Sequence, residues 1–204
     1  MSRSDRIRWG GLAFLAGGVL LAVGAVMHPD ETVEGAMALP AWGTAHAVLW
    51  VSLFFAVLGF TALYARVADA NGWMGLAAYV LTIFASLIFV SLTFLEATFA
   101  PRMAGMGAET AALLEMDGPV LGGRLGMILL ATSVAFTLGY VLFGVAVWKD
   151  GRLPKWAGAL LAVGGLIMPY SPPGPQILFQ LGGVLVGAGA AWLGWTMWSQ
   201  GDGA

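Results

Sequence analysis

The first long apolar run of this chain, Trp9 to Met27, contains no charged residue. A membrane-spanning helix needs about 20 apolar residues, so the run is long enough to cross a bilayer. The basic start before it is also typical of a secretory signal, but the run exceeds the usual signal core of about 7–15 residues. We therefore predict a retained first transmembrane helix.

The composition extends this prediction to the whole chain. Its residues are 59% hydrophobic and only 10% charged, whereas a soluble domain carries about 25% charged residues. We predict an all-α polytopic membrane protein, a single bundle domain over residues 1–204 with six transmembrane helices. These helices are expected at residues 9–27, 45–64, 73–95, 125–148, 156–170 and 177–198.

The distribution of basic residues predicts how the bundle is oriented. Loops on the cytoplasmic side of a membrane carry an excess of Lys and Arg. With six spans, seven basic residues fall on the side of the termini and two on the other. We predict a multi-pass protein of the inner (plasma) membrane, with the lipid bilayer around it and both termini cytoplasmic.

Short motifs indicate an internal repeat. A Trp-x-Gly sequence opens the first, third and fifth predicted helices, at Trp9, Trp73 and Trp156. A Leu-Gly-aromatic sequence lies near the inner end of the other three helices. The pattern favours three repeated helical hairpins, although the abundance of Leu, Gly and Trp explains it equally well.

Glycine spacing predicts close helix contacts. One stripe of small residues consists of Gly183, Gly187 and Ala191, and a second of Gly11, Gly18 and Ala25. Small residues let helix backbones approach closely inside a membrane. Each stripe can serve a contact within the bundle or a homo-oligomer interface.

The two histidines are the candidate site. His28 ends the first predicted helix and His46 begins the second, which places both at the outer side at similar depth. Neutral imidazole is a common ligand of metals and of haem iron. They are candidate metal ligands, or axial ligands of haem b. Alternatively, His28 is an interfacial residue before Pro29 and His46 stabilises a helix start.

Two charged residues join the histidines in one predicted layer. Glu96 and Arg124 fall at the outer ends of the third and fourth helices. Glu96 is a candidate for orienting a ligating histidine, and Arg124 for holding a haem propionate. The alternative is a simple ion pair between Glu96 and Arg124.

Other chemistries have less support. Most methionines fall in the outer half, which suits Cu(I), but Met is also a common filler of apolar cores. Copper is therefore the less favoured metal. The chain has no cysteine and no basic run that would follow nucleic acid phosphates. It also lacks nucleophile-elbow and metalloprotease motifs, so the expectation leans against an enzyme.

Three motifs resemble a family. They are His28-Pro29, Trp42-x-x-x-His46 and the stretch from Gly139 to Gly144, Gly-Tyr-Val-Leu-Phe-Gly. They resemble a diffuse set of uncharacterised bacterial multi-pass membrane proteins. The resemblance implies the membrane topology and carries no activity.

Three functional hypotheses remain open from the sequence. The first is a haem b protein for electron transfer or sensing, with His28 and His46 as ligands. The second is a non-catalytic accessory or structural subunit of a membrane complex. The third is a channel for a small solute, which needs a water-filled pore reaching Glu96.

Overall fold

The computed structural model describes residues 2–114, 118–120, 122–170 and 175–200, and these residues form helices and connections without a strand. The main helices are α1 (Arg3–Met27), α2 (Pro40–Thr98), α5 (Gly123–Asp150), α6 (Lys155–Ile167) and α7 (Gln176–Gln200). The short elements are η1 (Ala36–Ala38), α3 (Ala100–Ala104), α4 (Ala108–Ala112) and η2 (Met168–Tyr170). The predicted all-α class is confirmed.

Four helical stretches in the described part of the chain are long and apolar enough to cross a membrane. They are Arg3–Met27, Pro40–Ala104, Gly123–Asp150 and Gln176–Gln200. A helix rises about 1.5 Å per residue, so each is at least as long as a hydrocarbon core is thick. The prediction of a membrane protein agrees with this finding. Helix α6, with 13 residues, is shorter.

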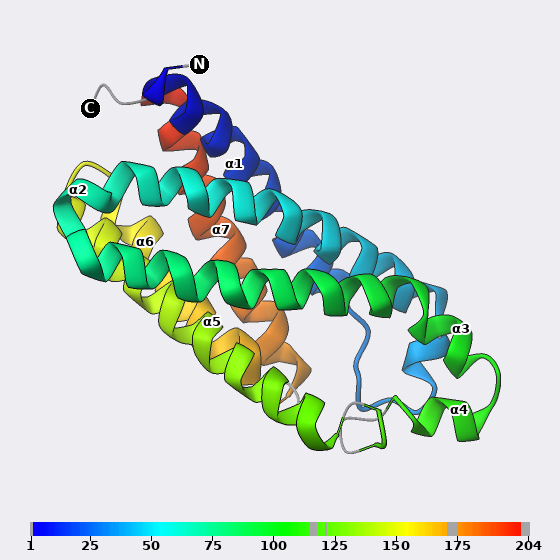
Figure 1. Cartoon of the computed structure of the whole chain (residues 1–204). Coiled ribbons are helices and arrows are strands. Elements are labelled where there is room, and N and C mark those ends of the chain that lie inside the picture. The colour runs from blue at the N-terminus through cyan, green and yellow to red at the C-terminus, as the bar shows by residue number, and fades with distance from the viewer. Residues whose placement is uncertain (1, 115–117, 121, 171–174, 201–204) are drawn as a thin grey trace.

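Helix α2 differs from the prediction of two helices joined by a loop. Its 59 residues are helical almost throughout, and only Gly72 leaves helical backbone angles, with φ 46° and ψ −125°. Residues with a Cβ rarely adopt such positive φ values, whereas glycine does so readily. At this point α2 folds back on itself, so that two antiparallel arms lie side by side (Figure 1).

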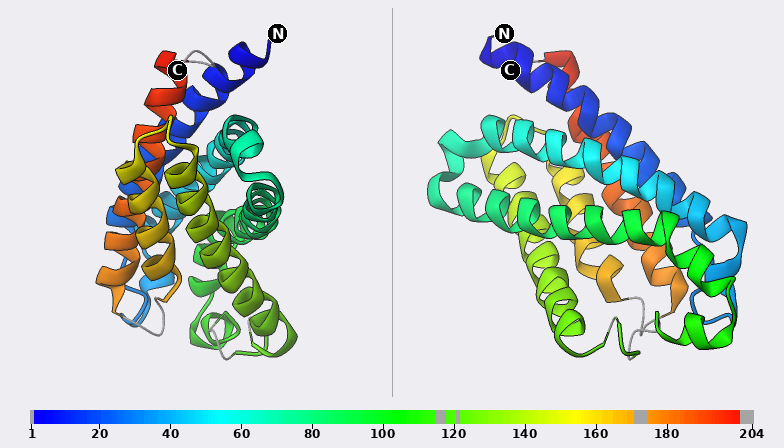
Figure 2. Two further views of the ribbon diagram at one scale, coloured as in Figure 1. Left: turned by 90° about the vertical axis from the view of Figure 1, so that its left-hand side faces the viewer. Right: turned by 45° about the vertical axis from the view of Figure 1, so that its right-hand side comes forward.

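The helices form a closed ring. Helix α1 packs against α7 and the first arm of α2, the second arm of α2 packs against α5, and α6 links α5 to α7. Figure 2 shows this arrangement from two further sides. Both termini lie at one end of the ring, and α3 and α4 lie at the other (Figure 1).

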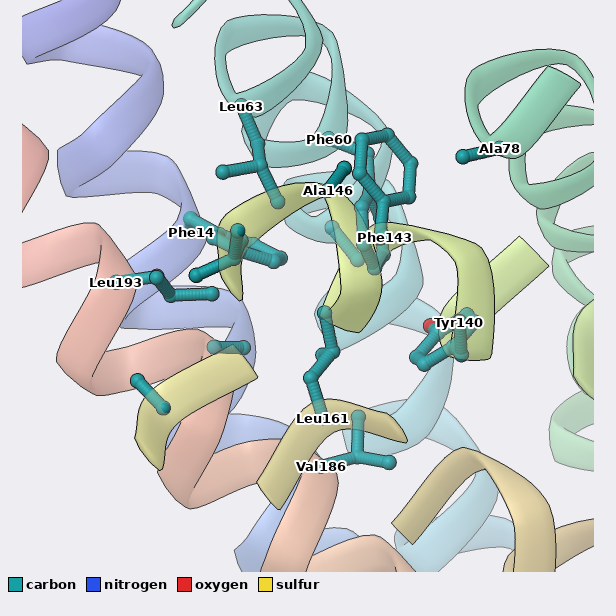
Figure 3. Close-up of a cluster of buried hydrophobic side chains, with 14 of the residues drawn as sticks. Phe14, Phe60, Leu63, Ala78, Tyr140, Phe143, Ala146, Leu161, Val186 and Leu193 are labelled. Carbon is teal, nitrogen blue, oxygen red and sulfur yellow. The ribbon is translucent and has the colours of Figure 1, made fainter. Parts of the chain in front are cut away.

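The core of the ring is aromatic and tightly packed. Phe60 on α2 contacts Phe14 of α1 and both Tyr140 and Phe143 of α5, with ring centroids about 5 Å apart. All four side chains are almost completely buried (Figure 3). This cluster joins three helices, and a separate polar group lies at the helix ends opposite the termini.

The predicted glycine stripes face each other inside the bundle. A Cβ added at Gly18 would overlap the backbone of Gly187 on α7, and one added at Gly187 would overlap Gly18. Gly183 likewise lies directly against Ala25. These stripes therefore form the α1–α7 contact, which the sequence could not distinguish from an oligomer interface.

Candidate functional site

The end of the bundle opposite the termini (Figure 1), which the sequence predicts to be the outer one, brings four ionisable side chains together. We call His28, Glu31, His46 and Glu96 the outer cluster. Helix α1 must end at His28 because Pro29 disfavours helical angles in the residue before it, and His28 has ψ 124°. The side chain therefore sits just beyond the helix and turns into the bundle, where the residue is only 5% exposed.

His46 is held by the first turns of α2. This helix begins with Pro40, a residue favoured in the first turn. Trp42 lies four residues before His46 on the same helix face, and the two rings stack with centroids 4.7 Å apart. The Trp42 ring also lies 5.2 Å from that of His28, so it forms a wall for both imidazoles.

The second arm of α2 and the loop after α1 supply the carboxylates. Glu96 Oε2 lies 2.9 Å from His46 Nε2, and Glu31 Oε1 lies 3.8 Å from His28 Nε2. The side chains of Glu31 and Glu96 are 26% and 25% exposed. The cluster therefore lies at the boundary between the buried bundle and its outer surface.

The protonation of each imidazole follows from its backbone partner. His46 Nδ1 lies 2.9 Å from the Trp42 carbonyl oxygen, and His28 Nδ1 lies 2.8 Å from that of Pro29. Carbonyl oxygens only accept hydrogen bonds, so we assign the proton to Nδ1 in both rings. The amide nitrogen of Gln176 lies 3.2 Å from the His28 carbonyl oxygen, to which it donates.

This assignment leaves the two Nε2 lone pairs facing each other. The nitrogens are 3.2 Å apart in a buried setting, with the Glu96 carboxylate beside one of them. Two lone pairs repel at this distance unless a cation lies between or beside them. A proton on His46 or a metal ion satisfies this requirement.

Two groups of the cluster outside the membrane-spanning stretches have shifted pKa values. Burial, followed by the charge on His46, lowers the pKa of His28 to about 4. Burial, followed by the charge on Glu96, raises the pKa of Glu31 to about 7. His28 is therefore a neutral imidazole at pH 7 and keeps its lone pair available.

The outer cluster differs from the predicted site in two residues. His28, His46 and Glu96 come together as predicted, with Glu96 beside a histidine. Arg124 is exposed and takes part in none of the ion pairs found among the described residues, so Glu96 pairs with His46 instead of Arg124. Sequence reasoning missed Glu31, for which the only signal was its position three residues after His28.

The described residues contain no preformed metal site with three or more ligands. No three His, Asp or Glu side chains in this part of the chain surround a common point as they would around a bound ion. The two imidazole nitrogens lie close enough together to share an ion. A site with three ligands would need a carboxylate to move toward them.

Comparisons with known proteins give no guide to the activity. Searches of protein-family models, of curated proteins and of solved structures found no match to this chain.

Proposed function

We propose that this chain is an inner-membrane protein of six spans that binds a divalent metal ion such as Zn²⁺ at the outer cluster. In this topology the two arms of α2 count as two spans, and α6 with η2 forms a short one. Three helical hairpins then follow one another, and both termini are cytoplasmic. The common end of the termini in Figure 1 and the excess of basic residues there support this orientation.

The facing Nε2 atoms carry the proposal. Zinc–nitrogen bonds are about 2.0–2.1 Å long, so two nitrogens at a tetrahedral zinc lie about 3.3 Å apart. His28 and His46 hold theirs at 3.2 Å. Each Nδ1–H is directed at a backbone carbonyl, which is the usual outer partner that orients a metal-binding histidine.

A carboxylate completes the proposed coordination. Glu96 Oε2 is already 2.9 Å from His46 Nε2, and rotation of this side chain toward the nitrogen pair brings in a third ligand. Nitrogen and oxygen donors together suit zinc and other first-row divalent ions. A fourth position stays open for water or another ligand.

The geometry favours a single ion over haem b. Iron between two axial histidines holds their nitrogens about 4 Å apart, with the porphyrin between the rings. Here the imidazole rings contact each other edge to face, with centroids 4.6 Å apart. Haem b stays a prediction, and a visible absorption band of protein expressed with ample haem is its test.

Copper also stays a prediction. Met168 borders the same cavity as both histidines, so the lining offers the two imidazoles and one thioether that suit a Cu(I) site. The neighbouring carboxylates favour a harder ion than Cu(I). Competition between Cu(I) and Zn²⁺ for the purified protein distinguishes the two metals.

Calorimetric titration of the detergent-solubilised, EDTA-stripped protein with Zn²⁺ tests the proposal. We expect one equivalent to bind. His28→Phe and His46→Phe keep an aromatic ring and remove the lone pair, so each should lower the affinity by more than the roughly 10–100-fold typical of outer-shell partners. Glu109→Gln removes an exposed acid of α4 outside the outer cluster and serves as the control.

The opposite result has a defined meaning. If wild-type protein binds no Zn²⁺, or if both histidine variants bind it equally well, the cation between the imidazoles is a proton and the proposal is wrong. Unchanged stability and partner binding in both variants would then favour the accessory-subunit hypothesis. Folding of each variant is checked by its thermal unfolding.

A further inference from the structure

A narrow cavity leads from the outer cluster into the bundle. Its volume is about 220 Å³, and all four residues of the outer cluster line it. Further in, it is bordered by Phe14, Phe60 and Tyr140. His46 and Phe60 are fourteen residues apart on one helix arm, which corresponds to about 21 Å. The cavity is therefore long and thin, with its charged groups concentrated at one end.

The inner walls are apolar and provide little for a polar ligand. The hydroxyl groups of Ser52, Thr93 and Ser133 border the cavity, but each donates its proton to a backbone carbonyl. An apolar cavity of about 150 Å³ in another protein stays dry and binds benzene. A larger cavity with similar walls therefore suits a hydrocarbon group more than a column of water.

We infer that this cavity binds a single-chain amphiphile, with its carboxylate head at the metal ion and its hydrocarbon chain inside the bundle. The inference rests on the proposed metal site. Zinc with two neutral imidazoles and the Glu96 carboxylate keeps one positive charge and an open position. A carboxylate head neutralises that charge, and the chain beyond it occupies the apolar end.

The probe molecules are chosen to match the length of the cavity and the charge proposed at its polar end. Dodecanoate carries a carboxylate head on a single hydrocarbon chain, and dodecanol has the same chain with a neutral head. Both compounds are radiolabelled, and their binding to the protein in micelles is measured by equilibrium dialysis. Micelles without protein provide the background. Both are tested with Zn²⁺ and after EDTA treatment.

Matched variants separate the cavity from the metal site. Ala56→Phe places a ring inside the cavity, ten residues along α2 from His46. Val51→Phe adds the same ring on the first arm of α2 at an exposed position that does not line the cavity. We expect Ala56→Phe to weaken dodecanoate binding at least about tenfold and to leave Zn²⁺ binding unchanged, whereas Val51→Phe changes neither.

The outcomes separate the two proposals. Zn²⁺-dependent dodecanoate binding that is lost in Ala56→Phe supports the inference. Zn²⁺ binding without dodecanoate binding overturns the inference and leaves the metal site standing. Dodecanoate binding that is indifferent to EDTA, or equal for dodecanol, overturns the role of the metal in holding the head. Absence of Zn²⁺ binding overturns the proposed function, and the inference with it.

A phospholipid is the alternative source of an acyl chain. Native mass spectrometry of protein purified with Zn²⁺ identifies which one occupies the cavity. A bound fatty acid that disappears in Ala56→Phe supports the inference, and a bound two-chain lipid in its place overturns the single-chain assignment.

Discussion

Both ends of the bundle bury charged groups, but the pairing of these groups differs between the two ends. At the end that holds the termini, Asp150 of α5 lies between Arg66 of α2 and Arg152, and we call these three residues the inner cluster. Its carboxylate side chain is fully buried, and the Arg152 guanidinium also donates to the Arg66 carbonyl oxygen. Opposite charges and donor–acceptor pairs are therefore matched, as a structural connection between helices requires.

The outer cluster is matched only when a cation is present. The two Nε2 atoms face each other 3.2 Å apart, Glu96 pairs with His46, Glu31 lies beside His28, and a cavity begins next to them. Buried polar groups that leave each other unsatisfied are costly unless a ligand or proton completes them. The comparison shows that burial of charge alone does not indicate a site. The outer cluster is proposed as one because its two facing imidazoles require a cation and lie next to a cavity.

The largest expected effect falls on the inner cluster. Asp150→Asn removes the carboxylate that faces Arg66 and should cost about 3 kcal/mol of unfolding free energy, at the lower end for removing one partner of a buried ion pair. Unfolding by SDS titration in mixed micelles measures it. The same measurement on His46→Phe should show a much smaller loss, and equal losses would remove the distinction between the clusters.

The second-largest effect is a pH dependence of the unfolding free energy, which we expect from the outer cluster. The lowered pKa of His28 adds stability above pH 6.5 that is lost as the pH falls toward 4, because the unfolded state binds more protons in that range. The raised pKa of Glu31 acts oppositely between about pH 4.5 and 7, because there the folded state binds more protons. The two slopes nearly cancel in the wild-type protein.

Glu31→Gln removes one slope and exposes the other. In EDTA, we expect this variant to lose about 2 kcal/mol of stability between pH 6.5 and 4.5, while the wild-type value stays nearly flat. The exposed neighbour Glu34 provides the control as Glu34→Gln, whose profile should match the wild type. A flat profile for Glu31→Gln would show that the two groups do not compensate each other.

The third effect concerns metal affinity. Glu96→Gln keeps the size of the side chain and removes the charge that lies beside His46. Because Glu96 is a proposed ligand, we expect Zn²⁺ affinity to fall by at least the roughly 10–100-fold typical of outer-shell partners, with little change in thermal unfolding. Calorimetry measures the affinity, and an unchanged value would exclude Glu96 as a ligand.

The smallest effect is expected at Gln176. Its amide donates to the His28 carbonyl oxygen, so it holds the backbone that carries the imidazole without reaching the proposed ion. Gln176→Ala should lower Zn²⁺ affinity by about tenfold. Gln176→Asn keeps the amide on a shorter side chain, so its Zn²⁺ affinity should lie between those of the wild type and Gln176→Ala. A loss as large as that of His28→Phe would show a more direct role.

Local patterns in the sequence predicted the helices well. Apolar runs located each main helix, because helix formation in lipid depends on backbone hydrogen bonds within each run. Several helices extend beyond the predicted ends, as α1 starts at Arg3 instead of residue 9 and α2 starts at Pro40 instead of residue 45. The turn at Gly72 was predicted as a loop, since nothing local shows that a helix continues to both sides of a single glycine. The position of the histidines at adjacent helix ends also predicted that the two imidazoles lie at one level, and the structure places their Nε2 atoms 3.2 Å apart.

The sequence by itself determined that the chain is helical and suited to a membrane, and that its two histidines lie at helix ends. Only the tertiary structure decided that the glycine stripes of α1 and α7 pack against each other and that Glu96 meets His46 instead of Arg124. Helix propensity and hydropathy are properties of short segments. The direction in which a side chain points across the bundle depends instead on the rotation of each helix about its axis, which its packing against the neighbouring helices sets.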